Sequence, residues 1–223
     1  MIITIIWRYK MNRLEKKFME ANKSKKIQIV KECVKQGVDV NVKDNGGDTA
    51  LVWDSYWGHL EIVKCLIDNG ADINVKSDDN WSALINSSWK GHVEVVKYLI
   101  EQGADVNAKS DDNWTALMLS SKRGNLNIVK YLLENGADVN AKNHNGYNAL
   151  SYSFSYERFK VVNYLIPYIY EYNQFEKIYN KLSLEQKHVL FKHFLNNEQL
   201  LKQVNLLKMK GFIKDINKYK SLT

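Results

Sequence analysis

Two pairs of adjacent carboxylates are the residues of this chain that come closest to acid–base chemistry: Asp78 with Asp79, and Asp111 with Asp112. Two carboxylates divide the roles of acid and base where an apolar pocket raises the pKa of one of them. Each pair is instead followed by Asn and Trp, in a polar stretch that is typical of an exposed turn. We therefore expect these aspartates to lie at loop tips and to perform no catalysis.

The histidines are not spaced for a metal site or a catalytic triad. His59 and His92 each follow a glycine and share no carboxylate at a fixed spacing. His188 and His193 are five residues apart on an expected helix, so they do not share a face as residues four apart would. The chain also has no glycine-rich phosphate loop and no G-x-S-x-G motif. We predict no enzyme activity, no metal and no cofactor.

The chain has only two cysteines, Cys33 and Cys65. Two cysteines exclude a disulfide framework and a four-cysteine zinc site. Both lie beside apolar residues in helical stretches, which predicts small core side chains in a reducing compartment.

The positive charge of the chain is concentrated at its ends. The 223 residues weigh 26.0 kDa and are 45% hydrophobic and 26% charged. This length and composition are ordinary for a globular chain of one or two domains. The net charge is +7. Residues 1–43 hold 11 basic and 4 acidic residues, residues 44–142 hold 9 and 15, and residues 143–223 hold 12 and 6. A basic average favours nucleic acid or a membrane surface, but the acidic centre favours a basic or mixed protein surface as the main partner.

Residues 1–7 are largely apolar and are followed by basic residues. The segment is shorter than the roughly 20 residues of a membrane span, and it lacks the preceding charges and the cleavage site of a signal peptide. It fits an extra strand or frayed end, a true start at Met11, or a membrane-touching anchor. We expect a cytoplasmic protein, and the sequence is also compatible with export to a host cell.

A repeat of 33 residues organises the centre of the chain. The pattern Gly-x-Asp-x-Asn begins at Gly37, Gly70, Gly103 and Gly136. Each unit predicts a turn, a short helix, a second turn, a longer helix and an extended loop. The N-cap residues are Thr49, Ser82, Thr115 and Asn148, and the glycines that end the first helices are Gly58, Gly91 and Gly124. Such units bury their apolar faces only by stacking on one another.

The units resemble ankyrin repeats. Residues 44–76 match that consensus at Gly47, Thr49, Leu51, Gly58-His59, Ile62-Val63, Leu66-Ile67 and residues 70–74, and residues 77–109 and 110–142 match nearly as well. The consensus proline is alanine in every unit, and Asn80 and Asn113 replace the turn glycine, since asparagine tolerates a positive φ. Residues 12–43 and 143–166 are degenerate end units.

This resemblance implies an all-α ankyrin repeat solenoid with β-hairpin loops over residues 12–166. It also implies that His59 and His92 are structural and bond loop backbone. Residues 167–223 lose the period and predict a helical C-terminal region. Pro167 ends the last repeat helix, and residues 170–182 are amphipathic. Residues 183–186 begin a helix that breaks at Asn196, and a further helix ends at Gly211. This region either caps the core of the last unit or forms a separate partner-binding or oligomerising region.

The resemblance further implies that partners contact the hairpin tips and the concave face of the first helices. The residues at these positions that we expect to bind a partner combine aromatic rings with charges: Asp48, Tyr56, Trp57, Asp78, Asp79, Trp81, Trp89, Asp111, Asp112, Trp114, Lys122, Arg123 and Tyr147. Trp81, Trp114 and Tyr147 are expected to form a ladder with one ring per unit. Aromatic faces beside carboxylates suit Arg or Lys side chains, which predicts a protein partner with a basic segment and no small-molecule substrate.

Two alternatives stay open. The aromatic residues before the N-caps could simply pack against the neighbouring hairpin, with Asp-Asp-Asn as turn chemistry. The lysine-rich ends could bind nucleic acid or a membrane surface, with strong salt dependence. The sequence also leaves open whether Asp54, which replaces a consensus alanine, faces the groove or caps a neighbouring group.

Overall fold

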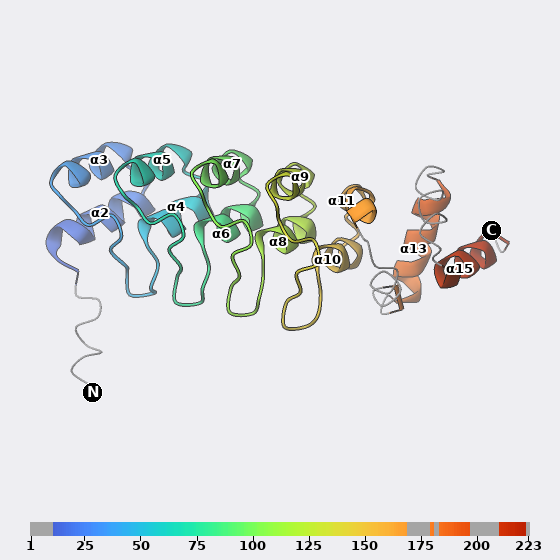
Figure 1. Cartoon of the computed structure of the whole chain (residues 1–223). Coiled ribbons are helices and arrows are strands. Elements are labelled where there is room, and N and C mark those ends of the chain that lie inside the picture. The colour runs from blue at the N-terminus through green and yellow to red at the C-terminus, as the bar shows by residue number, and fades with distance from the viewer. Residues whose placement is uncertain (1–10, 169–178, 181–182, 197–209, 222–223) are drawn as a thin grey trace, which may run out of the picture.

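The computed structural model describes residues 11–168, 179–180, 183–196 and 210–221. The apolar segment 1–7 and most of the helical stretches expected over residues 170–182 and 200–209 lie outside the described residues. Pairs of antiparallel helices stack side by side along the array, with long loops between them (Figure 1).

Each unit contributes one helix to each of two layers. The first helices are α2 (Arg13–Lys23), α4 (Ala50–Trp57), α6 (Ala83–Lys90), α8 (Ala116–Arg123) and α10 (Ala149–Ser155). The second helices are α3 (Ile27–Lys35), α5 (Leu60–Asp68), α7 (Val93–Glu101), α9 (Leu126–Glu134) and α11 (Phe159–Leu165). The chain continues through the 3-10 turn η1 (Ile166–Tyr168) to α13 (Leu184–Leu195) and α15 (Lys210–Lys220).

The helix ends follow the expected local chemistry. The hydroxyls of Thr49, Ser82 and Thr115 each accept a hydrogen bond from the backbone N–H three residues later, so they are N-caps. Gly58 ends α4 in the left-handed region with φ +76°. In the end units Lys25 and Glu157 hold the same turn at φ 55° and 57°, a conformation that is unfavourable for side chains with a Cβ.

One apolar core runs through the stack. The repeated first-helix leucines and second-helix valines are buried, from Leu51 and Val63 in the first full unit to Leu150 and Val162 in the last. Because the side chains of successive units belong to one cluster, the core exists only in the stacked array. The expected all-α repeat solenoid is confirmed.

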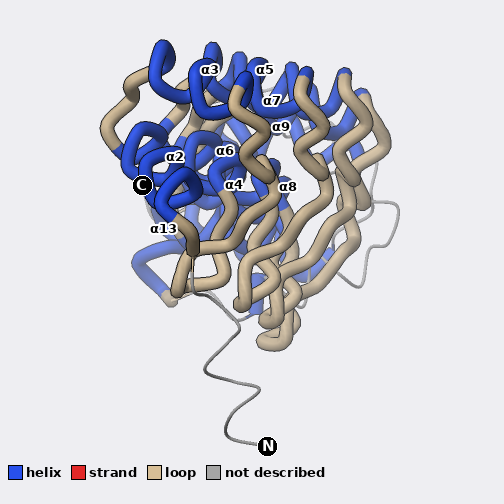
Figure 2. The backbone as a smooth tube through the Cα atoms, turned by 90° about the vertical axis from the view of Figure 1, so that its left-hand side faces the viewer, coloured by secondary structure: helices blue, strands red, loops and turns tan. Residues whose placement is uncertain are grey.

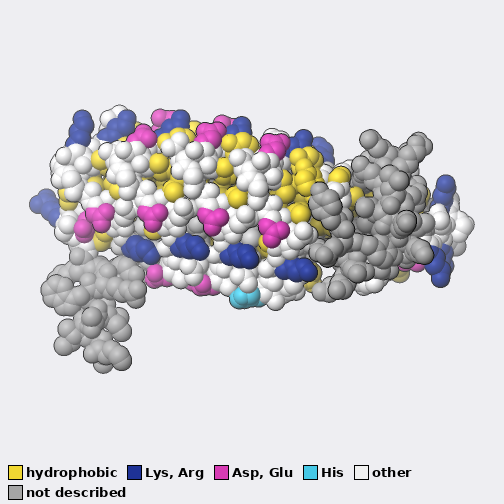
Figure 3. Space-filling model, in the orientation of Figure 1, with side chains coloured by type: hydrophobic (Ala, Val, Ile, Leu, Met, Phe, Trp, Pro, Cys, Tyr) yellow, Lys and Arg dark blue, Asp and Glu magenta, His cyan; other side chains and the backbone are white. Residues whose placement is uncertain are grey.

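The hairpin loops project to one side of the helices (Figure 2). Within the described residues they carry only single antiparallel bridges, Lys43 with Thr49 and Lys76 with Ser82. Neighbouring loops are tied by repeated bonds: the Nζ of Lys43 donates to the Lys76 carbonyl at 2.8 Å, and that of Lys76 donates to the Lys109 carbonyl at 3.3 Å. Because equivalent residues recur in each unit, acidic and basic side chains form parallel rows across the units (Figure 3).

The C-terminal region is helical where it is described. The helix expected after residue 183 is α13. The expectation that a helix ends at Gly211 is wrong, because Gly211 is the second residue of α15. The later residues of α15 hold it against the rest of the chain: Ile216 is buried in the core, and the hydroxyl of Tyr179 donates to Asp215 at 2.7 Å.

Candidate functional site

A pocket of about 450 Å³ lies between two hairpin tips and the helices α4 and α6. It brings together six of the residues that the sequence predicts to bind a partner: Asp48, Tyr56, Trp57, Asp79, Trp81 and Trp89. The sequence did not single out its other lining residues, which are Gly46, Val52, Trp53, Ser77 and Asn86. The pocket is therefore more local than the long surface expected from the sequence.

Aromatic rings form a continuous wall of this pocket. Ring centroids are 6.4 Å apart for Trp53 and Tyr56, 5.9 Å for Tyr56 and Trp89, and 5.5 Å for Trp89 and Trp81. Trp57 stands edge-on to Tyr56 at 5.0 Å and is 54% exposed. Edge-to-face contacts of this kind fix the orientation of the rings.

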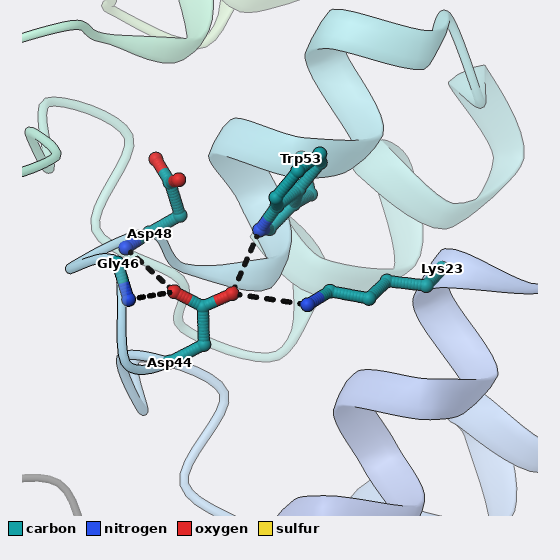
Figure 4. Close-up of polar contacts among 5 residues, drawn as sticks. All are labelled: Lys23, Asp44, Gly46, Asp48 and Trp53. Carbon is teal, nitrogen blue, oxygen red and sulfur yellow. Dashed lines mark hydrogen bonds and ion pairs between the residues drawn. The ribbon is translucent and has the colours of Figure 1, made fainter.

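Asp44 holds Trp53 in place (Figure 4). One oxygen of its buried carboxylate accepts from the indole Nε1 of Trp53 at 3.0 Å and from the Nζ of Lys23 at 3.1 Å. The other accepts from the backbone N–H groups of Gly46 at 2.9 Å and Asp48 at 3.1 Å. Burial alone would raise the pKa of Asp44, but these four bonds stabilise the charged form and the pKa is lowered.

The carboxylates gather at one side of the pocket. Burial and the charges of Asp44, Asp78 and Asp79 raise the pKa of Asp48. Asp78 packs on the backbone of Gly47, where an added Cβ would lie 2.2 Å from the Asp78 Cγ. A positively charged guest would relieve this concentration of negative charge.

Asn86 supplies an unused amide to the same pocket. Its side chain is 7% exposed, and among the described residues it has no hydrogen-bond partner. The amide is not one of the fully buried unpaired groups, because its polar atoms reach the pocket. The polar group is therefore free to bond a guest.

The other predicted residues lie outside the pocket, and several are already packed. Trp114 stacks on Tyr152 with centroids 4.6 Å apart and planes 29° apart, and Tyr147 lies 5.6 Å from the same ring. The Nζ of Lys122 lies 5.1 Å from the Trp114 centroid. Tyr152 of α10 contacts both Trp114 and Tyr147, so a first-helix ring connects these two of the three residues that recur once per unit.

The remaining charged residues lie beyond the pocket on the next tip and helix end. Asp111 and Asp112 are exposed at the next tip. Asp111 accepts a hydrogen bond from Asn80, which ties the two tips together. The guanidinium of Arg123 lies 5.5 Å from the Trp89 centroid. These residues extend the charged surface beside the pocket.

The two glycine-following histidines behave differently from each other. His92 bonds the backbone carbonyl of Tyr56 at 2.9 Å, as the resemblance implied. The same expectation is wrong for His59, whose Nδ1 lies 2.7 Å from Asp54. Asp54 is 1% exposed and faces neither the groove nor solvent; its second oxygen has no partner, and burial raises its pKa to about 8. Burial and the charges of Lys25 and His92 lower the pKa of His59.

The cysteines also differ. Cys33 is fully buried, as expected. Cys65 packs against the same core but is only half-buried, and it also lines a groove beside Lys31 and Lys64. His188 is exposed and packs on Tyr219, and the side chain of His193 lies outside what is described.

The described residues contain no group of three or more His, Cys, Asp or Glu placed to hold a metal. In the same residues, no helix is long and apolar enough to cross a membrane.

Comparison with known proteins agrees with this geometry. A family model described as ankyrin repeats (3 copies) matches residues 18–110 and 107–176, which is more than half of the chain. A search of the curated proteins gives no match. Ankyrin repeats are generally protein–protein interaction modules and are typically not enzymes. With the stacked helix pairs and the 33-residue period, this match shows that the chain belongs to the ankyrin repeat family.

Proposed function

We propose that this chain is a non-enzymatic interaction module that binds a basic segment of another protein through its hairpin tips and first helices. One observation carries the proposal: an aromatic pocket edged by carboxylates lies within the acidic part of the chain. Aromatic side chains are frequent anchors of protein interfaces. Neighbouring carboxylates select cationic partners over anionic ones.

The protein's own lysines illustrate the attraction of these rings for cations. The Nζ of Lys90 lies 4.1 Å from the Tyr56 centroid and 4.7 Å from that of Trp89. Such contacts are worth about 0.5–1 kcal/mol at exposed sites. Asp78, Asp111 and Asp112 extend the negative surface along the tips and would attract the rest of a basic segment.

A display library of random peptides tests the proposal with the full chain as bait. We expect the retained peptides to be enriched in Arg and Lys, and we expect Asp78→Lys with Asp111→Lys to lose them at low salt. Glu61→Lys with Glu94→Lys is the matched control, because it makes the same charge change on the exposed surface of the second helices. Retention of the same basic peptides by the tip variant would contradict the electrostatic part of the proposal.

Binding of anionic surfaces is the second candidate. It rests on the exposed lysines of α2 and α3 and of the turn between them, such as Lys16, Lys26 and Lys35. Retention of DNA or anionic vesicles that disappears with modest salt, and that survives the tip variant, would support it.

We also propose that residues 167–223 cap the array, because Phe191, Phe194 and Ile216 belong to the same apolar cluster as the repeats. The division near residue 166 and the cytoplasmic location remain predictions.

A further inference from the structure

The pocket between the first two tips has three kinds of lining: flat aromatic rings, carboxylates and one unpaired amide. We propose that it binds a single arginine side chain of the partner. This inference rests on the proposed function and specifies the guest at its centre.

The repeat explains why a pocket exists at this position. Asp48 occupies the place that Trp81, Trp114 and Tyr147 hold in the later units, 33 residues apart. Asn86 likewise occupies the place of Leu119 and Tyr152. In the last units this pair of positions is filled by the stacked rings of Trp114 and Tyr152. In the first units the same space is left open between a carboxylate and an amide.

The walls of this space suit a flat group. Trp53, Tyr56, Trp81 and Trp89 surround it with rings held by edge-to-face and tilted contacts and by the Asp44 bond. A guanidinium is planar, is weakly hydrated and stacks on aromatic faces, whereas an ammonium is compact and strongly hydrated. The volume of about 450 Å³ leaves room for the side chain and for part of its backbone.

The polar groups suit a guest with several N–H donors. The Asp48 and Asp79 carboxylates and the Asn86 amide oxygen all accept hydrogen bonds, and all three residues line the pocket. A guanidinium carries five N–H donors in one plane, a lysine ammonium carries three at one point, and a trimethylated lysine carries none. Arginine therefore satisfies more of these acceptors than either alternative.

The cations already near the wall do not fill the pocket. Lys90 lies over Tyr56 and Trp89, and Arg123 lies over Trp89. Neither residue lines the pocket. Because neither cation lines the pocket, Asp48 and Asp79 are available to the guest.

Titration of the full chain with acetylated, amidated Gly-Arg-Gly tests the inference, with the indole resonances of the tryptophans as reporters. We expect shifts for Trp53, Trp57, Trp81 and Trp89 and none for Trp114. The Lys and trimethyl-Lys peptides should bind about fivefold more weakly or worse, because they offer fewer donors. The neutral citrulline peptide should bind about tenfold more weakly, because it lacks the charge.

Two variants and a control separate the pocket from the rest of the surface. Asn86→Tyr, which copies Tyr152, and Asp48→Trp, which copies Trp81, should each weaken the Arg peptide about tenfold by closing the space. Glu61→Gln removes one carboxylate from the second-helix layer and should leave binding unchanged. Urea unfolding of each variant reports whether the array is intact, and either closing variant alone is sufficient if the other fails to fold.

Trimethyl-Lys binding as tightly as Arg, or Arg binding unchanged in a folded closing variant, would overturn the inference. The proposed function would survive that result if the display library still returned basic peptides that the tip variant loses. If the library returned no basic peptides at all, the proposed function would fail instead.

Discussion

Two contacts between neighbouring units have the same hairpin closure and different side chains. At the first face the hairpin of residues 44–48 meets Asn86 of α6, and at the later face the hairpin of residues 110–114 meets Tyr152 of α10. At the first face the Asp44 N–H closes the hairpin on the Asp48 carbonyl at 2.9 Å, and at the later face the Ser110 N–H closes it on the Trp114 carbonyl at 3.1 Å. The first face is an open pocket that Asn86 lines, whereas the later face is closed by Tyr152. A binding pocket can thus arise in a repeat protein where two large side chains are replaced and the closing bond of the hairpin is kept.

The two faces also differ in how their polar groups are satisfied. At the closed face the Tyr152 hydroxyl accepts from the Asn143 amide at 2.7 Å. The first face contains the unpaired Asn86 amide, and the unit that forms it buries Asp54 with one oxygen unbonded. The closed face thus uses the Asn143 amide and the Tyr152 hydroxyl internally, whereas the Asn86 amide of the first face is available to a guest.

The largest expected effect comes from opening the closed face. Tyr152→Ala removes a buried ring, its stack with Trp114 and a hydrogen bond, so the free energy of unfolding should fall by about 3 kcal/mol. The matched change at the open face, Asn86→Ala, should cost less than about 1 kcal/mol, because that amide bonds nothing. Urea unfolding measures both, and equal losses would show that the two faces are not packed differently.

The second effect is the pH dependence that Asp54 imposes on the open face. Its pKa is about 8 in the folded chain, against 3.8 as the ordinary value. The folded state therefore retains a proton that the unfolded state has lost, and stability falls as pH rises through 8. The lowered pKa of His59 acts in the opposite direction, but only below its ordinary value of 6.5.

Between pH 6.5 and 8 the Asp54 contribution should therefore lower the free energy of unfolding by up to about 2 kcal/mol. Asp54→Ser copies the units in which Ser87 and Ser120 bond the carbonyls of Leu84 and Leu117. Its free energy of unfolding should depend less on pH over this interval. A variant with the full slope of the natural chain would place the titrating group elsewhere.

The frame that both faces share could be predicted from the sequence. The period of 33 fixed the order of the helices, their caps at Thr49, Ser82 and Thr115, and the positive φ of Asn80 and Asn113. These features depend on local chemistry that each unit repeats. The tip residues followed from the same register, which is why six of the expected residues line the pocket.

The pocket itself could not be predicted, because it depends on contacts across units. Trp53 and Asn86 occupy the same first-helix position of successive units, a position that varies along the array, and their place in the pocket depends on the neighbouring tips. A comparison of the four copies for the unit that lacks a tip aromatic would have pointed to Asp48. The Asp54–His59 contact was missed for a simpler reason: the repeat suggested one role for both histidines.

The smallest effect concerns the turns. Gly47 and Gly146 occupy equivalent tips with φ of +75° and +74°, and an added Cβ meets the Asp78 carboxylate at the first and nothing within 4 Å at the other. Alanine at either position should cost about 1–2 kcal/mol, because a left-handed backbone is strained for residues with a Cβ. Gly47→Ala should cost up to about 1 kcal/mol more, since Asp78 must also move.

Urea unfolding of the two alanine variants gives this difference directly. Moving Asp78 should also disturb the carboxylates beside Asp48, so Gly47→Ala should weaken the Arg peptide whereas Gly146→Ala should not. Equal stability and equal binding in the two variants would mean that the first tip is no more constrained than the last. The contrast between the two faces would then lie in the helices alone, at the positions of Asn86 and Tyr152.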